Sequence, residues 1–182
     1  MMCVATTLLR LGVATRELYL CDTFDGMTVP EPLDKRHDGT PADTILAGTN
    51  KSRDDLDWAY ATLDEVRANL IRTGYPEERL HFVQGKVEDT IPAQAPEGIA
   101  LLRLDTDWYS STRHELIHLY PRLHVDGVLI IDDYGWWQGA KQAVDEYFNE
   151  LDFAPLLHRI DETARGCVKP SAHRQVSPRP IE

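Results

Sequence analysis

Residues 99–134 read IALLRLDTDWYSSTRHELIHLYPRLHVDGVLIIDDY and contain two short apolar runs, IALLRL and VLII, separated by a segment of helical character. Apolar runs of this length on either side of a helix predict neighbouring parallel strands of a buried sheet. Each run ends in acidic residues, Asp105 and Asp107 after the first and Asp132 and Asp133 after the second. Ligands bind beyond the carboxyl ends of such strands, so these aspartates are candidate site residues.

Carboxylates gathered at one edge of a sheet repel one another unless a cation joins them. Hard oxygen ligands of this kind suit Mg²⁺ or Ca²⁺ better than zinc. The two acidic pairs therefore predict a divalent-metal site at the strand ends. The alternative is that the aspartates cap the helices that follow them, which is a common role of Asp.

Length and charge narrow the class of protein. A chain of 182 residues can form one domain with a buried core. Its formal net charge of −11 argues against a nucleic-acid partner, because phosphate contacts need clustered Lys and Arg. No apolar stretch approaches the roughly 20 residues that span a bilayer, and the N-terminus lacks the pattern of a signal peptide. Cys3, Cys21 and Cys167 are expected to be reduced core residues, as in a cytoplasmic protein.

Hydrophobic periodicity and turn residues predict alternating helices and strands. The helices are expected at residues 1–13, 54–73 and 139–149, and further strands at 17–21 and 80–84. A last hairpin is expected from residues 153–160 and 164–168, with its turn at 161–163. Residues 27–50 are rich in Pro, Gly, Asp and Thr and predict a long loop, of the kind that forms a lid or a mobile segment. This alternation predicts one α/β three-layer domain over residues 1–170 and a flexible tail at 171–182.

The sequence His114-Glu115-Leu116-Ile117-His118 matches the H-E-x-x-H signature of zinc proteases. A zinc site here is not favoured, because the apolar residues of this helix form one stripe and both histidines point to the opposite, solvent side. Thr112 and Glu115 also match a T-x-x-E capping box, which predicts a helix start at Thr112 and a capping role for Glu115.

The stretches LRLDTDWYSSTRHELIHLYPRL and VDGVLIIDDYGWWQGAKQAVDEYF resemble the macrocin O-methyltransferase family. The resemblance extends to LYLCDTFDGM and HFVQGKVEDTIP, and so covers residues 8–170. Members of that family use S-adenosylmethionine and Mg²⁺ to methylate sugar hydroxyls of antibiotics and related metabolites. The resemblance implies a Rossmann-like class I methyltransferase fold, a three-layer sandwich whose mostly parallel sheet ends in a C-terminal antiparallel hairpin. It also implies a small-molecule hydroxyl acceptor.

The resemblance assigns roles to particular residues. The metal ligands are expected to be Asp105, Asp132 and Asp133. Asp22 matches the residue that holds the cofactor's ribose hydroxyls, with Thr23 and Phe24 beside it, and Glu88 and Asp89 match contacts to the adenine end. A carboxylate can accept hydrogen bonds from two adjacent hydroxyls, which fits the role of Asp22. The alternatives are an Asx turn at Asp22 and a solvated turn at Glu88 and Asp89.

The expected reaction is an in-line methyl transfer to a hydroxyl that a metal ion aligns and acidifies. The candidates for the group that accepts the hydroxyl's proton are Asp105 and Asp107. Five aromatic residues are candidates for stacking on a sugar or aglycone, with core or interface packing as the alternative: Trp108, Tyr109, Tyr134, Trp136 and Trp137.

The chain departs from the family pattern at its start. Family members carry a strand and a glycine-rich turn before the first helix, and this sequence begins inside that helix. The missing strand would lie between the strands that end at Asp22 and Asp105, so its loss would leave unpaired backbone groups. Three explanations stay open: a fragment or mis-called start codon, a sheet completed by another chain such as a homo-oligomer partner, and a protein that has lost methyl transfer.

Two function hypotheses follow. The first is an S-adenosylmethionine- and Mg²⁺-dependent O-methyltransferase that acts on a sugar or related natural product. The second is a truncated or degenerate, non-catalytic methyltransferase-like domain that keeps the acidic metal site.

Overall fold

A computed structural model describes residues 1–52, 57–151 and 154–171. The helices are α1 (Met2–Arg10), α2 (Ala42–Ala47), α3 (Leu63–Ile71), α4 (Val87–Thr90), α5 (Tyr109–Leu119) and α6 (Gln138–Glu150). The strands are β1 (Leu18–Asp22), β2 (Leu80–Gln84), β3 (Ile99–Leu104), β4 (Leu123–Ile131), β5 (His158–Arg159) and β6 (Arg165–Val168). Short 3-10 turns at Glu77–Arg79 and Tyr120–Arg122 lead into β2 and β4.

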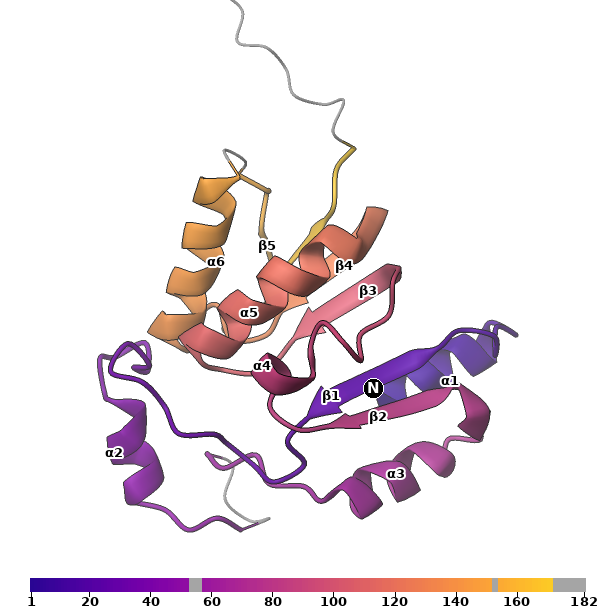
Figure 1. Ribbon diagram of the computed structural model, residues 1–182, viewed down its shortest axis with the longest axis horizontal. Coiled ribbons are helices and arrows are strands. Elements are labelled where there is room, and N and C mark those ends of the chain that lie inside the picture. The colour runs from indigo at the N-terminus through magenta and orange to yellow at the C-terminus, as the bar shows by residue number, and fades with distance from the viewer. Residues whose placement is uncertain (53–56, 152–153, 172–182) are drawn as a thin grey trace, which may run out of the picture.

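The strands form two sheets (Figure 1). In the smaller sheet β1 pairs in parallel with β2, and in the larger the order is β3-β4-β6-β5. β3 and β4 are parallel, whereas β6 pairs antiparallel with both β4 and β5. The predicted α/β architecture and C-terminal hairpin are confirmed. Within the described ranges no strand joins β1 to β3. A gap was expected at this place, between the strands that end at Asp22 and Asp105.

Each sheet has its own core. Helices α5 and α6 pack on each other and on β3 and β4, and the buried cluster there includes Leu116, Leu129, Ile131 and Val144. Helices α1 and α3 pack on the small sheet through a second cluster around Ala5, Leu18, Leu70, Tyr75 and Leu80. The two sheets therefore carry separate helix layers. The parallel strands β1, β2 and β3 end on the same side, toward the centre of the molecule (Figure 1).

Several local predictions are confirmed. β2 has the bounds expected from the sequence, and β1 and α6 differ from expectation by one residue at each end. α1 ends before Gly12, whose φ of +69° is easily adopted by glycine. The hairpin turn lies at residues 161–163 as predicted, although β5 has only two residues. No helix in the described part of the chain has the length and hydropathy needed to cross a membrane.

Four predictions need correction. The helix expected at 54–73 is α3, which begins at Leu63 because Thr62 and Glu65 form a capping box; residues 53–56 lie outside the described residues. The loop expected at 27–50 contains helix α2. β4 starts five residues earlier than the apolar run VLII. Finally, Cys3 is exposed, whereas Cys21 is half-buried and Cys167 is buried. Of the tail expected at 171–182, residues 172–182 also lie outside the described residues.

The capping box predicted at Thr112 is wrong. α5 already begins at Tyr109, and both Thr112 and Glu115 are buried inside it. The N-terminus of α5 is capped from a distant segment, because the carboxylate of Asp34 accepts a hydrogen bond from the Tyr109 amide at 2.8 Å. This contact between residues 75 positions apart takes the place of a local cap.

Candidate active site

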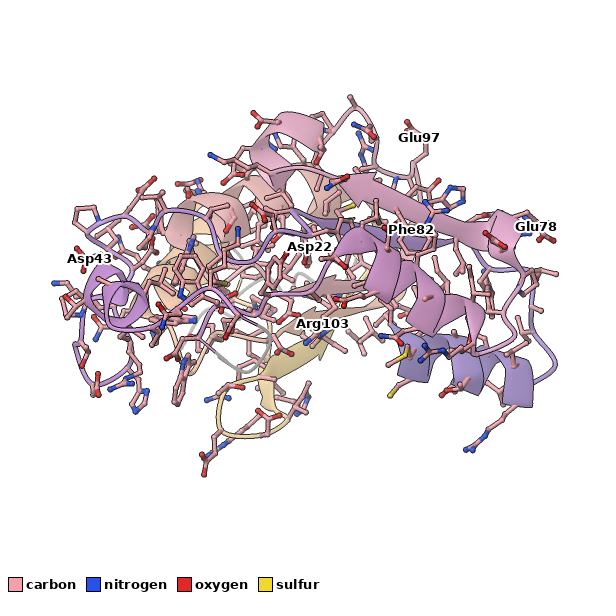
Figure 2. All side chains as sticks on the ribbon, turned by 90° about the horizontal axis from the view of Figure 1, so that it is seen from below. Asp22, Asp43, Glu78, Phe82, Glu97 and Arg103 are labelled. Carbon is pink, nitrogen blue, oxygen red and sulfur yellow. The ribbon has the colours of Figure 1, made fainter. Side chains whose placement is uncertain are left out.

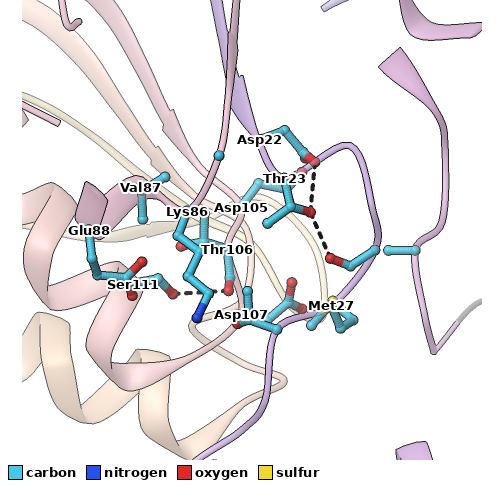
Figure 3. Close-up of a pocket in the computed structure, with 14 residues that line it drawn as sticks. Asp22, Thr23, Met27, Lys86, Val87, Glu88, Asp105, Thr106, Asp107 and Ser111 are labelled. Atoms are coloured by element: carbon cyan, nitrogen blue, oxygen red, sulfur yellow. Dashed lines mark hydrogen bonds between the residues drawn. The ribbon is translucent and has the colours of Figure 1, made fainter. Parts of the chain in front are cut away.

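A cavity of about 290 Å³ lies where β1, β2 and β3 end (Figure 3). Its walls come from three loops that follow these strands and from the start of α5. Figure 2 shows Asp22 near the middle of the molecule, far from Asp43 on α2 and from Glu78. The polar and charged residues of its lining are Asp22, Thr23, Thr28, Lys86, Glu88, Asp105, Thr106, Asp107 and Ser111. The position at the carboxyl ends of parallel strands is the usual ligand site of such folds.

Asp22 closes β1 and begins a tight turn. Its Oδ1 accepts a hydrogen bond from the Phe24 amide at 2.6 Å, and the Thr23 hydroxyl donates to the carbonyl of Gly26 at 2.8 Å. The Asx turn that the sequence left as an alternative is therefore present. Because Asp22 also lines the cavity, the turn orients its carboxylate and does not remove it from the site. Burial raises the pKa of this carboxyl, and the bond from Phe24 opposes the rise.

The other predicted cofactor residues divide into two groups. Thr23 and Glu88 line the cavity with Asp22. Phe24 is buried behind the turn with a φ of +51°, and Asp89 is exposed on α4; neither is among the lining residues. The structure thus brings three of the five predicted cofactor residues to one cavity.

The three predicted metal ligands lie together. Asp105, Asp132 and Asp133 each offer a carboxylate oxygen, and these three oxygens lie within 4.8 Å of one another. The parallel pairing of β3 with β4 brings the strand ends together, and the Asp132 amide donates to the carbonyl of Leu104 at 3.0 Å. Burial raises the pKa of Asp105 to about 7 and that of Asp133 to about 9, and neighbouring carboxylates add to both. A set of all-oxygen, mutually repelling donors fits a hard divalent ion such as Mg²⁺.

Asp107 adjoins this cluster, because its carboxyl shares a side-chain hydrogen bond with that of Asp133. Its φ of +69° is unusual for a residue other than glycine, and its Oδ1 accepts a hydrogen bond from the Trp137 indole at 2.7 Å. Burial raises the pKa of Asp107 to about 6 despite that bond. A second cavity of about 270 Å³ begins here, lined by Asp57, Asp133, Trp136 and Thr163 among others. Both cavities share Asp107 in their walls, so this carboxylate lies where the two meet.

The aromatic residues play different parts. Trp108 and Trp137 are buried and pack edge to face with ring centroids 4.9 Å apart. The hydroxyls of Tyr109 and Tyr134 donate to Glu146 and Asp145 on α6. Trp136 is 37% exposed and borders the second cavity, so it is the one of the five whose ring combines exposure with a place in a cavity wall.

The loop after β1 is anchored to Trp108 and Tyr109, at the start of α5. Asp34 accepts hydrogen bonds from its own loop at the Glu31 amide, 2.7 Å, and from the Tyr109 amide of α5. The Trp108 indole donates to the carbonyl of Thr28 at 3.1 Å, beside the cavity. The first half of the expected lid is therefore fastened to the site. No local pattern in the sequence marks Asp34 for this role.

Glu115 does not have the capping role predicted for it from the sequence. Its side chain is buried under the cavity floor, where its Oε2 accepts a hydrogen bond from the Thr106 hydroxyl at 2.8 Å. Burial raises the pKa of Glu115 to about 8. Ser111 braces the same turn by donating to the carbonyls of Thr106 and Trp108. The turn that carries Asp105 and Asp107 is thus held from beneath by α5.

The histidines of the H-E-x-x-H sequence do not form a metal site with a third ligand in the described part of the chain. Their ring centroids lie 4.4 Å apart with the ring planes tilted by 54°, and His114 Nε2 lies 2.9 Å from the carbonyl of Ile91. Both side chains are half-buried and not fully in solvent as predicted. The apolar stripe of Leu116 and Leu119 is buried as expected.

Known proteins match this chain closely. Residues 1–166 match the model of the macrocin O-methyltransferase (TylF) family. A demethyldecarbamoylnovobiocin O-methyltransferase from Streptomyces niveus is 33% identical over 82% of this chain and 53% of its own length. An 8-demethyl-8-(2,3-dimethoxy-alpha-L-rhamnosyl)-tetracenomycin-C 4'-O-methyltransferase from Streptomyces olivaceus is 31% identical over 84% of this chain and 54% of its own length.

The fold comparison agrees. The structure of the O-methyltransferase NovP superposes with a TM-score of 0.77 and 29% identity, over 93% of this chain and 66% of that one. The chain spans about half the length of the curated relatives it matches. The motifs, the fold and the match over residues 1–166 lead to one conclusion: the chain belongs to the macrocin O-methyltransferase family.

Proposed function

We propose that this chain forms the site of an S-adenosylmethionine- and Mg²⁺-dependent O-methyltransferase that acts on a hydroxyl of a sugar or related natural product. One observation carries the proposal: the carboxylates of Asp105, Asp132 and Asp133 converge beside a cavity formed by the ends of β1, β2 and β3. A metal-ligand set next to a strand-end cavity is what such a reaction needs, because the acceptor and the cofactor must meet at the ion.

The proposed cofactor site is the first cavity. Asp22, fixed by its turn, would accept hydrogen bonds from two ribose hydroxyls, and Thr23 lies beside it. Glu88 lines the opposite wall and would contact the adenine end, while Phe24 and Asp89 would support the cavity from outside its lining. Bound there, S-adenosylmethionine would supply the activated methyl group.

The proposed metal ligands are Asp105, Asp132 and Asp133. The ion they would hold supplies positive charge that lowers the pKa of a nearby hydroxyl. Asp107 is favoured over Asp105 as the acceptor of the hydroxyl proton, because a carboxylate bound to a metal is a weak base. Its place in both cavity walls and its fixed bond from Trp137 would hold its carboxylate toward the acceptor.

The proposed acceptor site is the second cavity, where the exposed ring of Trp136 can cover one face of a sugar or aglycone. The names of the two curated relatives, one of them with a rhamnosyl group, support a natural product of this class. A small molecule also agrees with the net charge of −11, which disfavours nucleic acid. The cytoplasmic location and a homo-oligomeric state stay predictions.

A non-catalytic domain that keeps the metal site is the second candidate. One observation supports it: among the described residues no strand joins β1 to β3, and the proposed cofactor cavity lies at the ends of these two strands. In that case the acidic cluster would bind an ion without supporting methyl transfer.

Calorimetric titration of the full chain with S-adenosylmethionine, with and without Mg²⁺, separates the two candidates. The first predicts binding that Asp22→Asn weakens at least about tenfold, since it removes a charged hydrogen-bond acceptor. Asp25→Asn is the matched control, because Asp25 is an exposed neighbour that pairs with Lys51. Absence of binding at millimolar cofactor, together with intact Mg²⁺ binding, would favour the second candidate.

A further inference from the structure

The guanidinium of Arg103 bridges two of the proposed metal ligands. Its Nη1 donates to Asp105 Oδ2 at 2.5 Å. Its Nε donates to Asp132 Oδ1 at 3.2 Å, and its Nη2 lies 2.9 Å from Asp132 Oδ2. All three nitrogens of the fork are therefore engaged with the carboxylates that lie closest to the strand ends.

Sheet geometry places Arg103 there. Side chains alternate along a strand, so Arg103 and Asp105 lie on the same face of β3. Arg103 is paired with Ile130 of β4, two residues before Asp132, and Asp132 therefore follows on the same side. Figure 2 shows Arg103 in the central part of the molecule, away from Asp43 and Glu78. The strand register thus fixes the approach of the guanidinium to both carboxylates.

The side chain is not locked in place by burial. Arg103 is 43% exposed, and Asp105 and Asp132 are 44% and 32% exposed. A long side chain at this level of exposure can swing into solvent without leaving a cavity or an unsatisfied buried group. The ion pair is therefore one that another cation can displace.

We propose that Arg103 is an internal cation that competes with the divalent ion for Asp105 and Asp132. It balances part of the negative charge of these two carboxylates when no ion is bound, and it withdraws from at least one of them when an ion binds. The inference rests on the proposed metal site. Its physical basis is that a guanidinium and a divalent ion within a few ångströms of the same oxygens repel each other.

If Arg103 had a different role, its removal would change the metal affinity in the opposite direction. If Arg103 orients the two carboxylates for the ion, its removal should weaken metal binding, because the ligands would lose their alignment. If Arg103 competes, its removal should strengthen metal binding. The direction of one affinity change therefore separates the two roles.

The experiment is a calorimetric titration of the full chain with Mg²⁺, repeated with Mn²⁺, for the wild type and three variants. Arg103→Gln should raise the affinity at least about tenfold, because it removes a charge in direct contact with the ligands. Arg103→Lys keeps the charge but not the two-pronged guanidinium, so its Mg²⁺ affinity should lie between those of the wild type and Arg103→Gln. Arg165→Gln is the matched control: Arg165 lies on the neighbouring strand β6, opposite Ile131, but donates to the carbonyls of Asp161 and Ala164.

A second readout needs no metal affinity. Without divalent ions, Arg103→Gln should lower the melting temperature, since Asp105 and Asp132 lose their countercharge, and saturating Mg²⁺ should remove the difference. Far-UV circular dichroism verifies that each variant is folded. Equal affinities of wild type and Arg103→Gln, or weaker binding by the variant, would overturn the inference, as would the absence of metal binding by every protein. A variant that binds Mg²⁺ more tightly while S-adenosylmethionine binds to neither protein would support the inference and refute the proposed methyl transfer.

Discussion

Glu115 offers a direct test of how the site is built, because its carboxyl is buried beneath the turn that carries Asp105 and Asp107. It lies on α5 beside the core residue Leu116, and the Thr106 hydroxyl donates to it. Burial raises its pKa from 4.5 to about 8. The carboxyl is therefore expected to be protonated in the folded protein at neutral pH.

A raised pKa makes stability depend on pH in a defined direction. Between pH 4.5 and 8 the unfolded chain loses the Glu115 proton while the folded protein keeps it, so folded protein binds more protons. This contribution to stability is fully present below pH 4.5 and is lost as pH rises through 8. From pH 5 to 7 the free energy of unfolding should fall by about 2.5 kcal/mol through Glu115 alone.

Glu115→Gln isolates this effect, since its amide oxygen still accepts from Thr106 but does not titrate. Urea unfolding curves, followed by tryptophan fluorescence at pH 5, 6 and 7, measure the free energy of unfolding of both proteins. We expect the free energy of unfolding of the variant, relative to that of the wild type, to rise by about 2.5 kcal/mol from pH 5 to pH 7. Glu146→Gln is the control: hydrogen bonds from Tyr109 and Gln142 lower the pKa of Glu146, so its difference from the wild type should stay flat above pH 6. If wild type and Glu115→Gln keep a constant difference in stability from pH 5 to 7, the carboxyl is not protonated in the fold and the reasoning fails.

Three further predictions concern single residues. Asp132→Asn should weaken Mg²⁺ binding at least about tenfold without changing the unfolding midpoint of the metal-free protein by more than a few degrees, because the residue follows the end of β4 and lies outside the core. Calorimetry that shows an unchanged affinity would remove Asp132 from the ligand set. Asp34→Ala should cost about 1–3 kcal/mol of stability in urea unfolding, because the Tyr109 amide loses its acceptor, and a cost near zero would show that another group caps α5. In a thiol-labelling experiment at pH 8, the exposed Cys3 should react well before Cys21, whose thiol pKa burial raises to about 11; equal rates would contradict the described burial.

Local patterns were sufficient where the determining interactions are close in sequence. The short apolar runs in β2, β3 and β4 were enough to predict that these segments are strands. The helix predicted from Thr112 shows the limit of such patterns. A T-x-x-E sequence satisfies the capping rule, but in the structure both residues are buried inside α5 and Glu115 accepts a hydrogen bond from Thr106.

Parts of the site depend on partners that no local pattern reveals. Asp34 reaches Tyr109 across 75 residues, and the Trp137 indole reaches Asp107 across 30. Arg103 was not identified because it reads as one exposed polar residue in an alternating strand. Its role as the partner of Asp105 and Asp132 appears only once the register of β3 against β4 is known.

The sequence by itself determined the positions of β1, β2 and β3 to within one residue, and it showed that two adjoining strands are each followed by carboxylates, because apolar runs and acidic ends are properties of short segments. Tertiary structure alone decided that three of those carboxylates face one point and that a guanidinium sits between two of them. The physical reason is that register, burial and charge pairing are set by packing between segments that the chain brings together only on folding.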